Sequence, residues 1–378
     1  MPRKKLLFVS NLFPDACEPY RGLDNATVLH HLAAQFDIQV LALRPRLPFS
    51  SRPKLVARDE DRIFSPEFME VPYIPKIGSR WNHRLIAGKL RPVIKEMAPS
   101  QVLSSWIYPD SCAVSLLSGE LGFPFVSIAQ GSDVHQYLKM PVRRGIIVDA
   151  LRKASAVITR SGELARLLAE AGVAREKLHP VYNGIDFDVF KPGDQARARQ
   201  ELGLPAKGKV VLFVGNFVPI KNPLLLIEAC SRLNSSGEPS HLAMIGGGPL
   251  EMEARALAKK LAVPVTFAGR KRAAEVAAYM RAADLLCVPS KNEGVPNVIL
   301  EAFASGLPVL ASRVGGIPEV LAHDYLGKLM EPDNLQELAD CLGEILGKEP
   351  QREIIRQHGL QFSWERASSA YSELLLCQ

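Results

Sequence analysis

The sequence predicts an α/β protein built from two doubly wound parallel sheets of the Rossmann-like kind. The chain has 378 residues, which exceeds what one hydrophobic core usually organises, so two domains are expected. Short apolar runs alternate with stretches of helical periodicity, and this alternation occurs twice along the chain. The runs are continuously apolar, which is typical of strands buried on both faces of a parallel sheet.

The first half of the chain contains six apolar runs that predict strands. Stretches of helical spacing separate several of them and predict covering helices. The expected strands are residues 6–10, 36–43, 102–105, 123–128, 156–159 and 179–182, and the expected helices include 24–35 and 162–171. Residues 44–75 are rich in proline and charge and have little periodicity, so we expect a long loop there.

The second half repeats the same rhythm after a turn-rich segment. Asn183-Gly184 and Lys191-Pro192 have turn chemistry, which predicts a first domain of residues 1–188 and a second of 189–361. The expected strands are 209–214, 241–245, 263–267, 284–290 and 309–312, and the expected helices are 194–202, 224–233, 251–261 and 273–283.

Composition excludes several classes of protein. The sequence is 47% hydrophobic and 23% charged, as in globular proteins, and no run of about 18 apolar residues predicts a membrane-spanning helix. The short apolar stretch near the N-terminus is better explained as a first strand than as a signal peptide. Six scattered cysteines without a Cys-x-x-Cys pair argue against zinc and disulfides, and the histidines show no metal spacing. We therefore expect a cytoplasmic protein with no resident metal.

The net charge of +6 is unevenly distributed. Residues 1–193 hold 26 basic and 19 acidic residues, whereas residues 194–378 hold 20 and 21. Residues 44–95 contain twelve basic residues against five acidic ones. This stretch predicts either a solvated basic face or a surface for an anionic lipid or acceptor, with possible association at the inner face of a membrane. Nucleic acid is not expected, because neither interleaved aromatics nor a recognised binding motif accompanies the charges.

The segment 292–308 places two carboxylates beside an expected helix. Pro296 suits the first helical turn, and Gly306 followed by Pro308 forms a stop signal. Glu293 would then lie in the preceding loop and Glu301 about five residues into the helix, with an axial separation of roughly 7–8 Å. Alone, a glutamate near a helix start is often only a cap favoured by the helix dipole. Two separated carboxylates could also hold two parts of one extended ligand, beside the outward N–H groups of Gly294, Val295 and Asn297.

The context of this segment, residues 284–320, resembles the retaining glycosyltransferases of family 4. These enzymes have the GT-B architecture, in which two Rossmann-like domains face each other across a cleft. Their signature is a pair of glutamates separated by seven residues, followed by a strand like the one that begins at Pro308-Val309. The resemblance implies that Glu293 contacts hydroxyls of the donor sugar and that Glu301 holds the nucleotide ribose.

A second matching segment is the end of the 209–214 strand. The family has Gly-Arg there, followed five residues after the arginine by a lysine, and both basic groups grip the donor diphosphate. Gly215 and Lys221 match this pattern, whereas Asn216 replaces the arginine. The loop Gly246-Gly247-Gly248 and the segment ending at Arg270 resemble those that face the donor nucleotide and its base.

The resemblance is looser in the first half. Gly22 matches one of two adjacent glycines whose backbone approaches the transferred sugar or diphosphate. Gln130 stands where the family often has histidine, so no histidine base is expected. Asp133 is kept and either orients the acceptor hydroxyl or caps the helix that follows it.

Together these matches imply a hexosyltransferase that retains the anomeric configuration and needs neither metal nor cofactor. Its substrates would be a UDP- or GDP-sugar and a hydroxyl on a glycan or lipid-linked acceptor, in the biosynthesis of cell-surface polysaccharide or glycolipid. Residues 362–378 would pack back on the first domain as a helix. The expected catalytic residues are Glu293, Lys221 and Asp133, and the expected donor contacts are Gly22, Gly215, Asn216, Lys221, Gly246, Gly247, Gly248, Arg270, Glu293, Gly294, Val295, Pro296, Asn297, Val298 and Glu301.

Two alternatives remain open at this point. The departures at Asn216 and Gln130, with the loss of one glycine beside Gly22, are compatible with a catalytically silent protein that binds sugar nucleotides. A nucleotide-sugar epimerase of the same architecture is the other alternative. A dehydrogenase is disfavoured, because residues 10–22 lack the Gly-x-Gly-x-x-Gly of a dinucleotide site.

Overall fold

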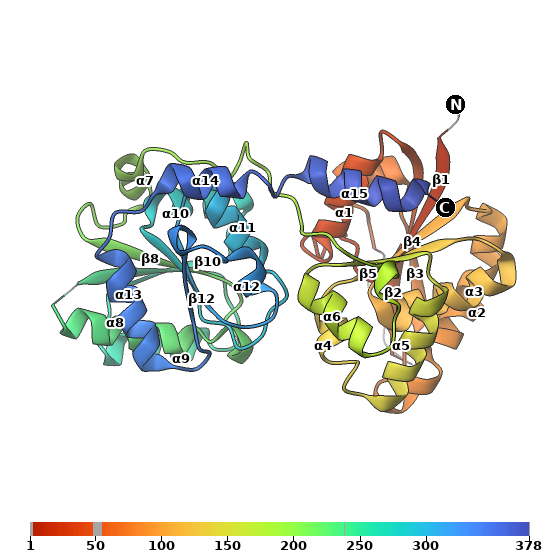
Figure 1. The fold of residues 1–378 in the computed structure, drawn as a ribbon, viewed down its shortest axis with the longest axis horizontal. Coiled ribbons are helices and arrows are strands. Elements are labelled where there is room, and N and C mark those ends of the chain that lie inside the picture. The colour runs from red at the N-terminus through yellow and green to blue at the C-terminus, as the bar shows by residue number, and fades with distance from the viewer. Residues whose placement is uncertain (1–2, 48–54, 238, 378) are drawn as a thin grey trace. The chain divides into compact units, whose positions relative to one another are not determined.

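The chain folds into two units, each organised around its own parallel sheet (Figure 1). The computed structural model describes residues 3–47, 55–237 and 239–377. Unit 1 comprises the described residues up to Asn183 together with those from Trp364 onward, and unit 2 runs from Gly184 to Ser363. The observed boundary lies five residues before the one expected at 188.

The sheet of unit 1 has seven strands, and all of its neighbouring strands are parallel. The strand order is β3-β2-β1-β4-β5-β6-β7. The strands are β1 (Lys4–Ser10), β2 (Phe36–Arg46), β3 (Glu67–Pro72), β4 (Gln101–Ser105), β5 (Phe125–Ala129), β6 (Ala156–Thr159) and β7 (Leu178–Pro180).

Helices cover both faces of this sheet. Residues of α2, α3, α5 and α6 share one apolar cluster, and residues of α1 and α15 share the other. The helices are α1 (Leu23–Leu32), α2 (Asn82–Met97), α3 (Cys112–Leu121), α4 (Ser132–His135), α5 (Pro141–Lys153), α6 (Gly162–Glu170) and α15 (Trp364–Leu376). Short helical turns are η1 (Asp59–Phe64), η2 (Lys76–Arg80), η3 (Ile107–Ser111) and η4 (Arg175–Lys177).

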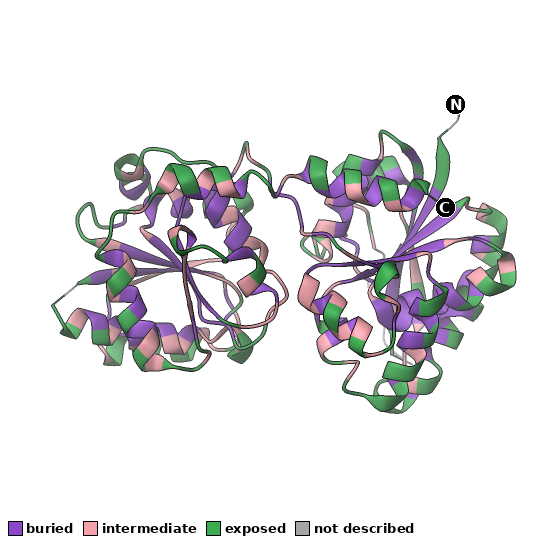
Figure 2. Ribbon diagram, viewed as in Figure 1, coloured by how far each residue is buried: buried purple, intermediate pink, exposed green. Residues whose placement is uncertain are grey.

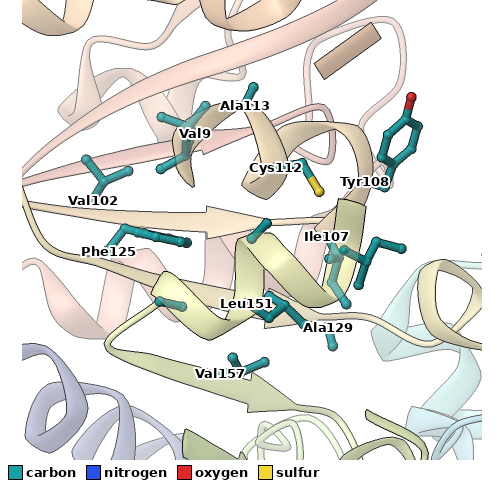
Figure 3. Close-up of a cluster of buried hydrophobic side chains, with 14 of the residues drawn as sticks. Val9, Val102, Ile107, Tyr108, Cys112, Ala113, Phe125, Ala129, Leu151 and Val157 are labelled. Atoms are coloured by element: carbon teal, nitrogen blue, oxygen red, sulfur yellow. The ribbon is translucent and has the colours of Figure 1, made fainter. Parts of the chain in front are cut away.

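Strand β1 shows why the central residues of a strand, here residues 6–9, are all apolar. Leu7 and Val9 belong to the cluster under α2, α3, α5 and α6, whereas Leu6 and Phe8 belong to the cluster under α1 and α15. Successive side chains of a strand point to opposite faces, so a strand covered on both sides has no polar face. Figure 3 shows Val9 in the first cluster, with side chains from the neighbouring strands and from α3 and α5.

The sheet of unit 2 has six parallel strands in the order β10-β9-β8-β11-β12-β13. The strands are β8 (Lys209–Val214), β9 (Ser240–Ile245), β10 (Val265–Gly269), β11 (Leu285–Val288), β12 (Val309–Ser312) and β13 (Gly327–Met330). The prediction of two doubly wound parallel sheets is confirmed by these topologies.

The helices of unit 2 also lie on two faces (Figure 1). Residues of α8, α9 and α13 form one apolar cluster with β8, and α7, α10, α11 and α14 lie on the other side. The helices are α7 (Gln195–Leu202), α8 (Pro223–Ser235), α9 (Glu251–Lys260), α10 (Ala273–Ala282), α11 (Asn297–Ala304), α12 (Ile317–Val320), α13 (Leu335–Leu346) and α14 (Arg352–Gly359), with turns η5 (Pro219–Lys221) and η6 (Asp324–Leu326).

Two strands were not expected from the sequence. The expectation of a loop over residues 44–75 is wrong in part, because β2 continues to Arg46 and β3 occupies Glu67–Pro72. Strand β3 is at the edge of the sheet, where glutamates and a terminal proline are tolerated, so its sequence lacks an apolar run. The second unexpected strand is β13, which pairs in parallel with β12 and forms one edge of the unit 2 sheet. In the described part of the chain, no helix is long and apolar enough to cross a membrane.

Candidate functional site

The strand order of unit 2 reverses direction between β8 and β11. In open parallel sheets, ligands bind beside the carboxyl ends of the strands at such a point, because the two following loops diverge and leave a crevice. The loop after β8 begins at Gly215, and the loop after β11 leads through Glu293 to α11. The candidate donor residues of the second domain therefore lie on the loops at this edge of the sheet.

Lys221 and Glu293 form an ion pair across the two loops. The Nζ atom of Lys221 donates to Oε1 of Glu293, and the hydroxyl of Ser290 donates to the same oxygen at 2.7 Å. The side chains are 29% and 11% exposed, respectively, so the pair is partly shielded but still reaches solvent. The second oxygen of Glu293 accepts no hydrogen bond within the described residues, which leaves it able to accept one from a hydroxyl.

The turn that carries Lys221 is tied to the neighbouring loops. The amide of Lys291 donates to the carbonyl oxygen of Ile220 at 2.8 Å. Asn222 and Lys291 both donate to Oδ1 of Asp333, at 2.9 and 2.6 Å. These bonds fix the backbone that presents the lysine.

Glycines allow the loops after β8 and β9 to pack backbone against backbone. A Cβ atom on Gly246, which has φ of 136°, would lie 1.9 Å from the carbonyl oxygen of Gly215. A Cβ atom on Gly248 would lie 2.7 Å from the carbonyl oxygen of Phe217. Any larger residue at either position would push the two loops apart. Gly247 has more room, because the nearest atom to a Cβ there, Oε2 of Glu251, would lie 3.4 Å away at van der Waals distance.

Gly315 supports the backbone of Glu293 in the same way. Its φ is 55°, and a Cβ atom there would lie 1.8 Å from the carbonyl oxygen of Glu293. The amide of Gly316 donates to the carbonyl oxygen of Gly294 at 3.0 Å. Sequence reasoning assigned no role to Gly315 or Ser290, although both lie at strand ends beside residues that it did select.

Helix α11 carries Glu301 where the sequence placed it, about five residues from the helix start. Its first residue is Asn297, and Pro296 immediately precedes it with an extended backbone. Glu301 is the fifth helical residue and is partly buried, as is Val298 in the first turn. Within the described residues, the amides of Gly294 and Val295 donate to no acceptor in the protein, so they are available at the start of the helix.

Asn216 and Arg270 are exposed at the ends of β8 and β10. The amide of Val218 donates to the carbonyl oxygen of Asn216 at 2.9 Å. Arg270 extends toward the glycine loop, since a Cβ atom on Gly247 would lie 3.9 Å from its Nε atom. The structure thus brings the candidate residues of unit 2 to one edge of its sheet, on the loops after β8, β9, β10 and β11.

The candidate residues of unit 1 lie at the carboxyl edge of its own sheet, and Asp133 is fully buried there. One carboxylate oxygen accepts from the amides of Gln130 and Gly131 at 3.0 and 2.8 Å, and the other accepts from the amide of Ile107 at 2.9 Å. Burial raises the pKa of this carboxyl, and the three amides lower it in part. This geometry holds the loops after β4 and β5 together, which is a structural role. The alternative that Asp133 caps the following helix is wrong, because Asp133 is itself the second residue of α4 and Gly131 is the N-cap.

Gln130 is also engaged inside unit 1. Its amide nitrogen donates to Asn25 Oδ1 at 2.9 Å and to Ser105 Oγ at 2.7 Å. The Nε atom of Arg160 donates to its oxygen at 3.4 Å. Both ends of its side-chain amide therefore have protein partners.

Gly22 is required for packing at the start of α1. Its φ is 64°, and a Cβ atom would lie 2.3 Å from the carbonyl carbon and oxygen of Leu12. This close approach brings the loop before α1 against the end of β1. Whether the backbone of Gly22 also meets a donor remains a prediction.

Asp110 is a buried carboxylate that sequence reasoning missed, because it belongs to no recognised motif. Its Oδ2 atom accepts from the backbone amide and side-chain amide of Asn11, at 2.6 and 2.8 Å. Burial raises its pKa to about 7, although the bonds from Asn11 and the charge of Arg21 oppose this shift. Arg21 itself donates to the carbonyl oxygen of Asn11 at 2.8 Å.

Within residues 3–47, 55–237 and 239–377, no group of three or more histidine, cysteine, aspartate or glutamate side chains is placed to hold a metal ion. Lys221 and Glu293 form an ion pair at the switch point of unit 2, whereas Asp133 and Asp110 of unit 1 are buried.

Comparison with protein families identifies both halves of the chain. Residues 25–189 match the model described as Glycosyltransferase Family 4, and residues 194–362 match the model described as Glycosyl transferases group 1. A D-inositol 3-phosphate glycosyltransferase from Mycolicibacterium smegmatis is 33% identical over 224 residues, which cover 57% of this chain. The match covers 50% of that relative, so the chain spans about half the length of this curated protein.

Two solved structures are similar over the whole chain. HepE from Anabaena, crystallised with UDP, has a TM-score of 0.78 at 20% identity and covers 99% of this chain and 100% of its own. Sucrose-phosphate synthase from Thermosynechococcus elongatus has a TM-score of 0.76 at 20% identity, with full coverage of both chains. HepE was also crystallised with UDP-glucose. At this level of identity the likeness establishes the fold.

Proposed function

The chain belongs to the family 4 glycosyltransferases of GT-B fold, and from this premise we propose that it transfers a hexose from a nucleoside diphosphate sugar to an acceptor hydroxyl, with retention at the anomeric carbon. One observation carries the proposal: the Lys221–Glu293 pair at the switch point of unit 2 joins a cation to a carboxylate with an available oxygen. Such a pair complements a ligand that has phosphates at one end and sugar hydroxyls at the other.

The departing diphosphate develops negative charge as its bond to the sugar breaks. In our proposal Lys221 leaves Glu293 to stabilise that charge, and the available amides of Gly294 and Val295 add hydrogen bonds. Glu293, released from the lysine, accepts hydrogen bonds from hexose hydroxyls. Glu301, the fifth residue of α11, holds the ribose. Positioning and charge stabilisation are then the main contributions of the protein.

The leaving phosphate would accept the proton of the attacking acceptor on the same face of the sugar, which accounts for retention. The positive charge at the diphosphate comes from protein groups in this proposal, so full activity is expected in the presence of EDTA. An inverted product, measured by NMR of the anomeric proton, would overturn the retaining mechanism.

We propose UDP or GDP as the nucleotide of the donor. The UDP and UDP-glucose found with HepE, which shares this fold, support UDP as the first candidate. A thermal-shift panel of UDP- and GDP-sugars tests this directly, because a ligand bound at 100 times its Kd stabilises the folded state by about 2.7 kcal/mol. Stabilisation by none of these donors would count against the proposed function.

The acceptor in this proposal is a glycan or lipid-linked molecule in the synthesis of cell-surface polysaccharide or glycolipid. Six free cysteines, four of them buried, support work in a reducing compartment such as the cytoplasm. Radiolabel transfer from the identified donor to extracted lipid or glycan fractions would identify the acceptor class.

A catalytically silent protein that binds sugar nucleotides is the second candidate. It is favoured by the complete engagement of Gln130 inside unit 1 and by the neutral Asn216 in the diphosphate region. The two candidates differ in donor turnover. Slow hydrolysis of the bound donor without acceptor supports the transferase, whereas tight donor binding with neither hydrolysis nor transfer supports the silent protein.

A further inference from the structure

Unit 1 carries two segments that are basic and lack any acidic residue. Residues 71–95 contain Lys76, Arg80, Arg84, Lys89, Arg91 and Lys95, and residues 136–148 contain Lys139, Arg143 and Arg144. The sequence had located the basic surface over residues 44–95. Three arginines in the first part of that range do not contribute to a basic surface, because carboxylates neutralise them. Arg44 is buried and bonded to Asp15 at 2.7 Å. Arg46 pairs with Glu70, and Arg58 pairs with Asp61. The seven residues 48–54 lie outside the described part of the chain.

The two basic segments are joined through one buried arginine. The guanidinium carbon of Arg143 in α5 lies 4.9 Å from the ring centre of Tyr108 and 4.3 Å from that of Tyr137. Its Nε atom donates to the hydroxyl of Ser79 in η2 at 3.1 Å, and the hydroxyl of Tyr108 donates to the carbonyl oxygen of Ser79 at 2.9 Å. The residues after Ser79 and those around Arg143 therefore belong to one surface.

Large apolar side chains are exposed on this surface. Ile77 is 77% exposed, Trp81 51%, Met140 44% and Val142 38%. The neighbouring cationic residues are exposed as well, namely Lys76, Arg80, Arg84, Lys139 and Arg144. We call these nine residues the basic–apolar patch. Figure 2 shows exposed positions along both α2 and α5, the helices that carry part of it.

We propose that the basic–apolar patch docks unit 1 onto an anionic lipid surface. Lysine and arginine next to a membrane are attracted by anionic headgroups, while apolar tips enter the region between headgroups and acyl chains. Tryptophan in particular favours that interface, where its ring is half solvated. No acidic residue in either segment opposes the attraction. The exposed isoleucine, methionine and valine distinguish the patch from a nucleic-acid surface, which needs stacking aromatics rather than aliphatic tips.

The basic–apolar patch lies close to the candidate residues of unit 1. Segment η2 follows strand β3, and the turn into α5 follows β5 and α4, so the patch lies beside the carboxyl edge of the sheet. Asp133 and Gln130 occupy the same edge. If the proposed transfer reaction holds, docking here would bring a membrane-borne acceptor to unit 1. The docking itself does not depend on the reaction and is tested without it.

Flotation of the full chain with lipid vesicles tests the proposal. We expect binding to vesicles of phosphatidylcholine with about one third phosphatidylglycerol at low ionic strength, and weaker binding as salt screens the charges. We expect little binding to phosphatidylcholine alone. The fluorescence of Trp81 should shift to the blue with anionic vesicles, and Trp81→Phe should lose that shift because Trp106 and Trp364 are more buried.

A charge reversal at three patch residues, K76E/R80E/R84E, should weaken vesicle binding by at least 100-fold, given about fivefold per basic residue near an anionic surface. The matched control reverses three exposed lysines of unit 2, K207E/K259E/K260E, with the same change in net charge. We expect this control to bind as the unchanged protein does. Circular dichroism and unchanged donor-induced thermal shifts would show that both variants remain folded.

Three results would each overturn the proposal. The first is no binding to anionic vesicles at low salt, and the second is equal loss of binding in the two triple variants, which would mean that net charge alone matters. The third is binding of duplex DNA with no binding of vesicles, which would make the patch a nucleic-acid surface.

Discussion

The two sheets end in polar edges that differ in how their polar groups are used. In unit 2, Lys221 and Glu293 are partly exposed, and glycines bring bare backbone close to them. In unit 1, the carboxylate of Asp133 accepts from three backbone amides, and the side-chain amide of Gln130 bonds the side chains of Asn25, Ser105 and Arg160. A ligand can therefore replace the Lys221–Glu293 contact of unit 2 at small cost. At the edge of unit 1 it would first have to break buried hydrogen bonds.

Polar residues at the end of a strand can therefore have either of two roles, ligand binding or structural support. A partly exposed ion pair can exchange its partner for a charged ligand, because solvent already offsets part of its attraction. A buried carboxylate with three amide donors is a structural joint, and its loss leaves unpaired donors in the core. Substitutions at four places test this distinction, and their expected effects decrease from the ion pair through Gly315 and Asp133 to Asp110.

The largest effect is expected at the ion pair. Lys221→Ala and Glu293→Ala should each lower kcat/KM by about 10³-fold, because each removes a group that acts on the charged transition state or the sugar. Steady-state kinetics with the identified donor measure this, and Lys207→Ala, at an exposed lysine of the same unit, is the control. Turnover within about fivefold of the unchanged protein in either variant would show that the pair is not the site.

The next effect is expected at Gly315, which touches no ligand in our proposal. Gly315→Ala places a Cβ atom 1.8 Å from the carbonyl oxygen of Glu293, so the backbone must move. A displacement of about 1 Å would lower kcat/KM by about 10²-fold. Gly203→Ala is the matched control, since Gly203 has φ of 64° but no atom within 4 Å of its Cβ position. Equal losses in the two variants would attribute the effect to backbone conformation rather than to the position of Glu293.

Asp133→Asn tests the buried edge of unit 1. The new amide group would place N–H atoms against backbone N–H donors, so the free energy of unfolding should fall by about 2.5 kcal/mol. Chemical denaturation measures it, with Asp149→Asn on the exposed face of α5 as the control. If stability is kept while kcat falls more than 100-fold, Asp133 acts on substrate as the family resemblance implies.

The smallest effect is expected from the ionisation of Asp110. Its pKa is raised to about 7 in the folded chain, so the folded state binds a proton that the unfolded state releases near pH 4. Stability from this group is present below pH 4 and is lost as the pH rises toward 7. Between pH 6 and 8, the stability of Asp110→Asn relative to the unchanged protein should therefore rise by about 1.4 kcal/mol. A constant difference across that range would show that Asp110 is not protonated in the folded chain.

Much of the fold could be predicted from local sequence because its strands are buried on both faces. The runs at 156–159 and 209–214, for example, coincide with β6 and β8. The edge strands β3 and β13 escaped prediction for a physical reason. An edge strand needs no second neighbour and tolerates charge and proline, so its residues Glu67 to Pro72 carry no apolar run.

The parts of the candidate site that depend only on spacing along the sequence could be predicted. The seven-residue interval placed Glu293 in a loop and Glu301 on the following helix, as the structure shows. The pairing of Lys221 with Glu293 could not be predicted, because it depends on two loops that are 72 residues apart. The burial of Asp133 and Asp110 was also beyond the sequence, since an aspartate after a strand looks the same whether its carboxylate faces solvent or the core.

The interruption of unit 1 by unit 2 has a consequence for biosynthesis. Helix α15 supplies Trp364, Tyr371 and Leu375 to the core around α1, yet a ribosome makes it only after the 180 residues of unit 2. At about 5–20 residues per second, the apolar face of α1 waits roughly ten seconds or more for its cover. Unit 2 is continuous and can fold in that interval. The half of the protein that is translated first is therefore completed last, and during that interval a nascent chain of this kind depends most on chaperones.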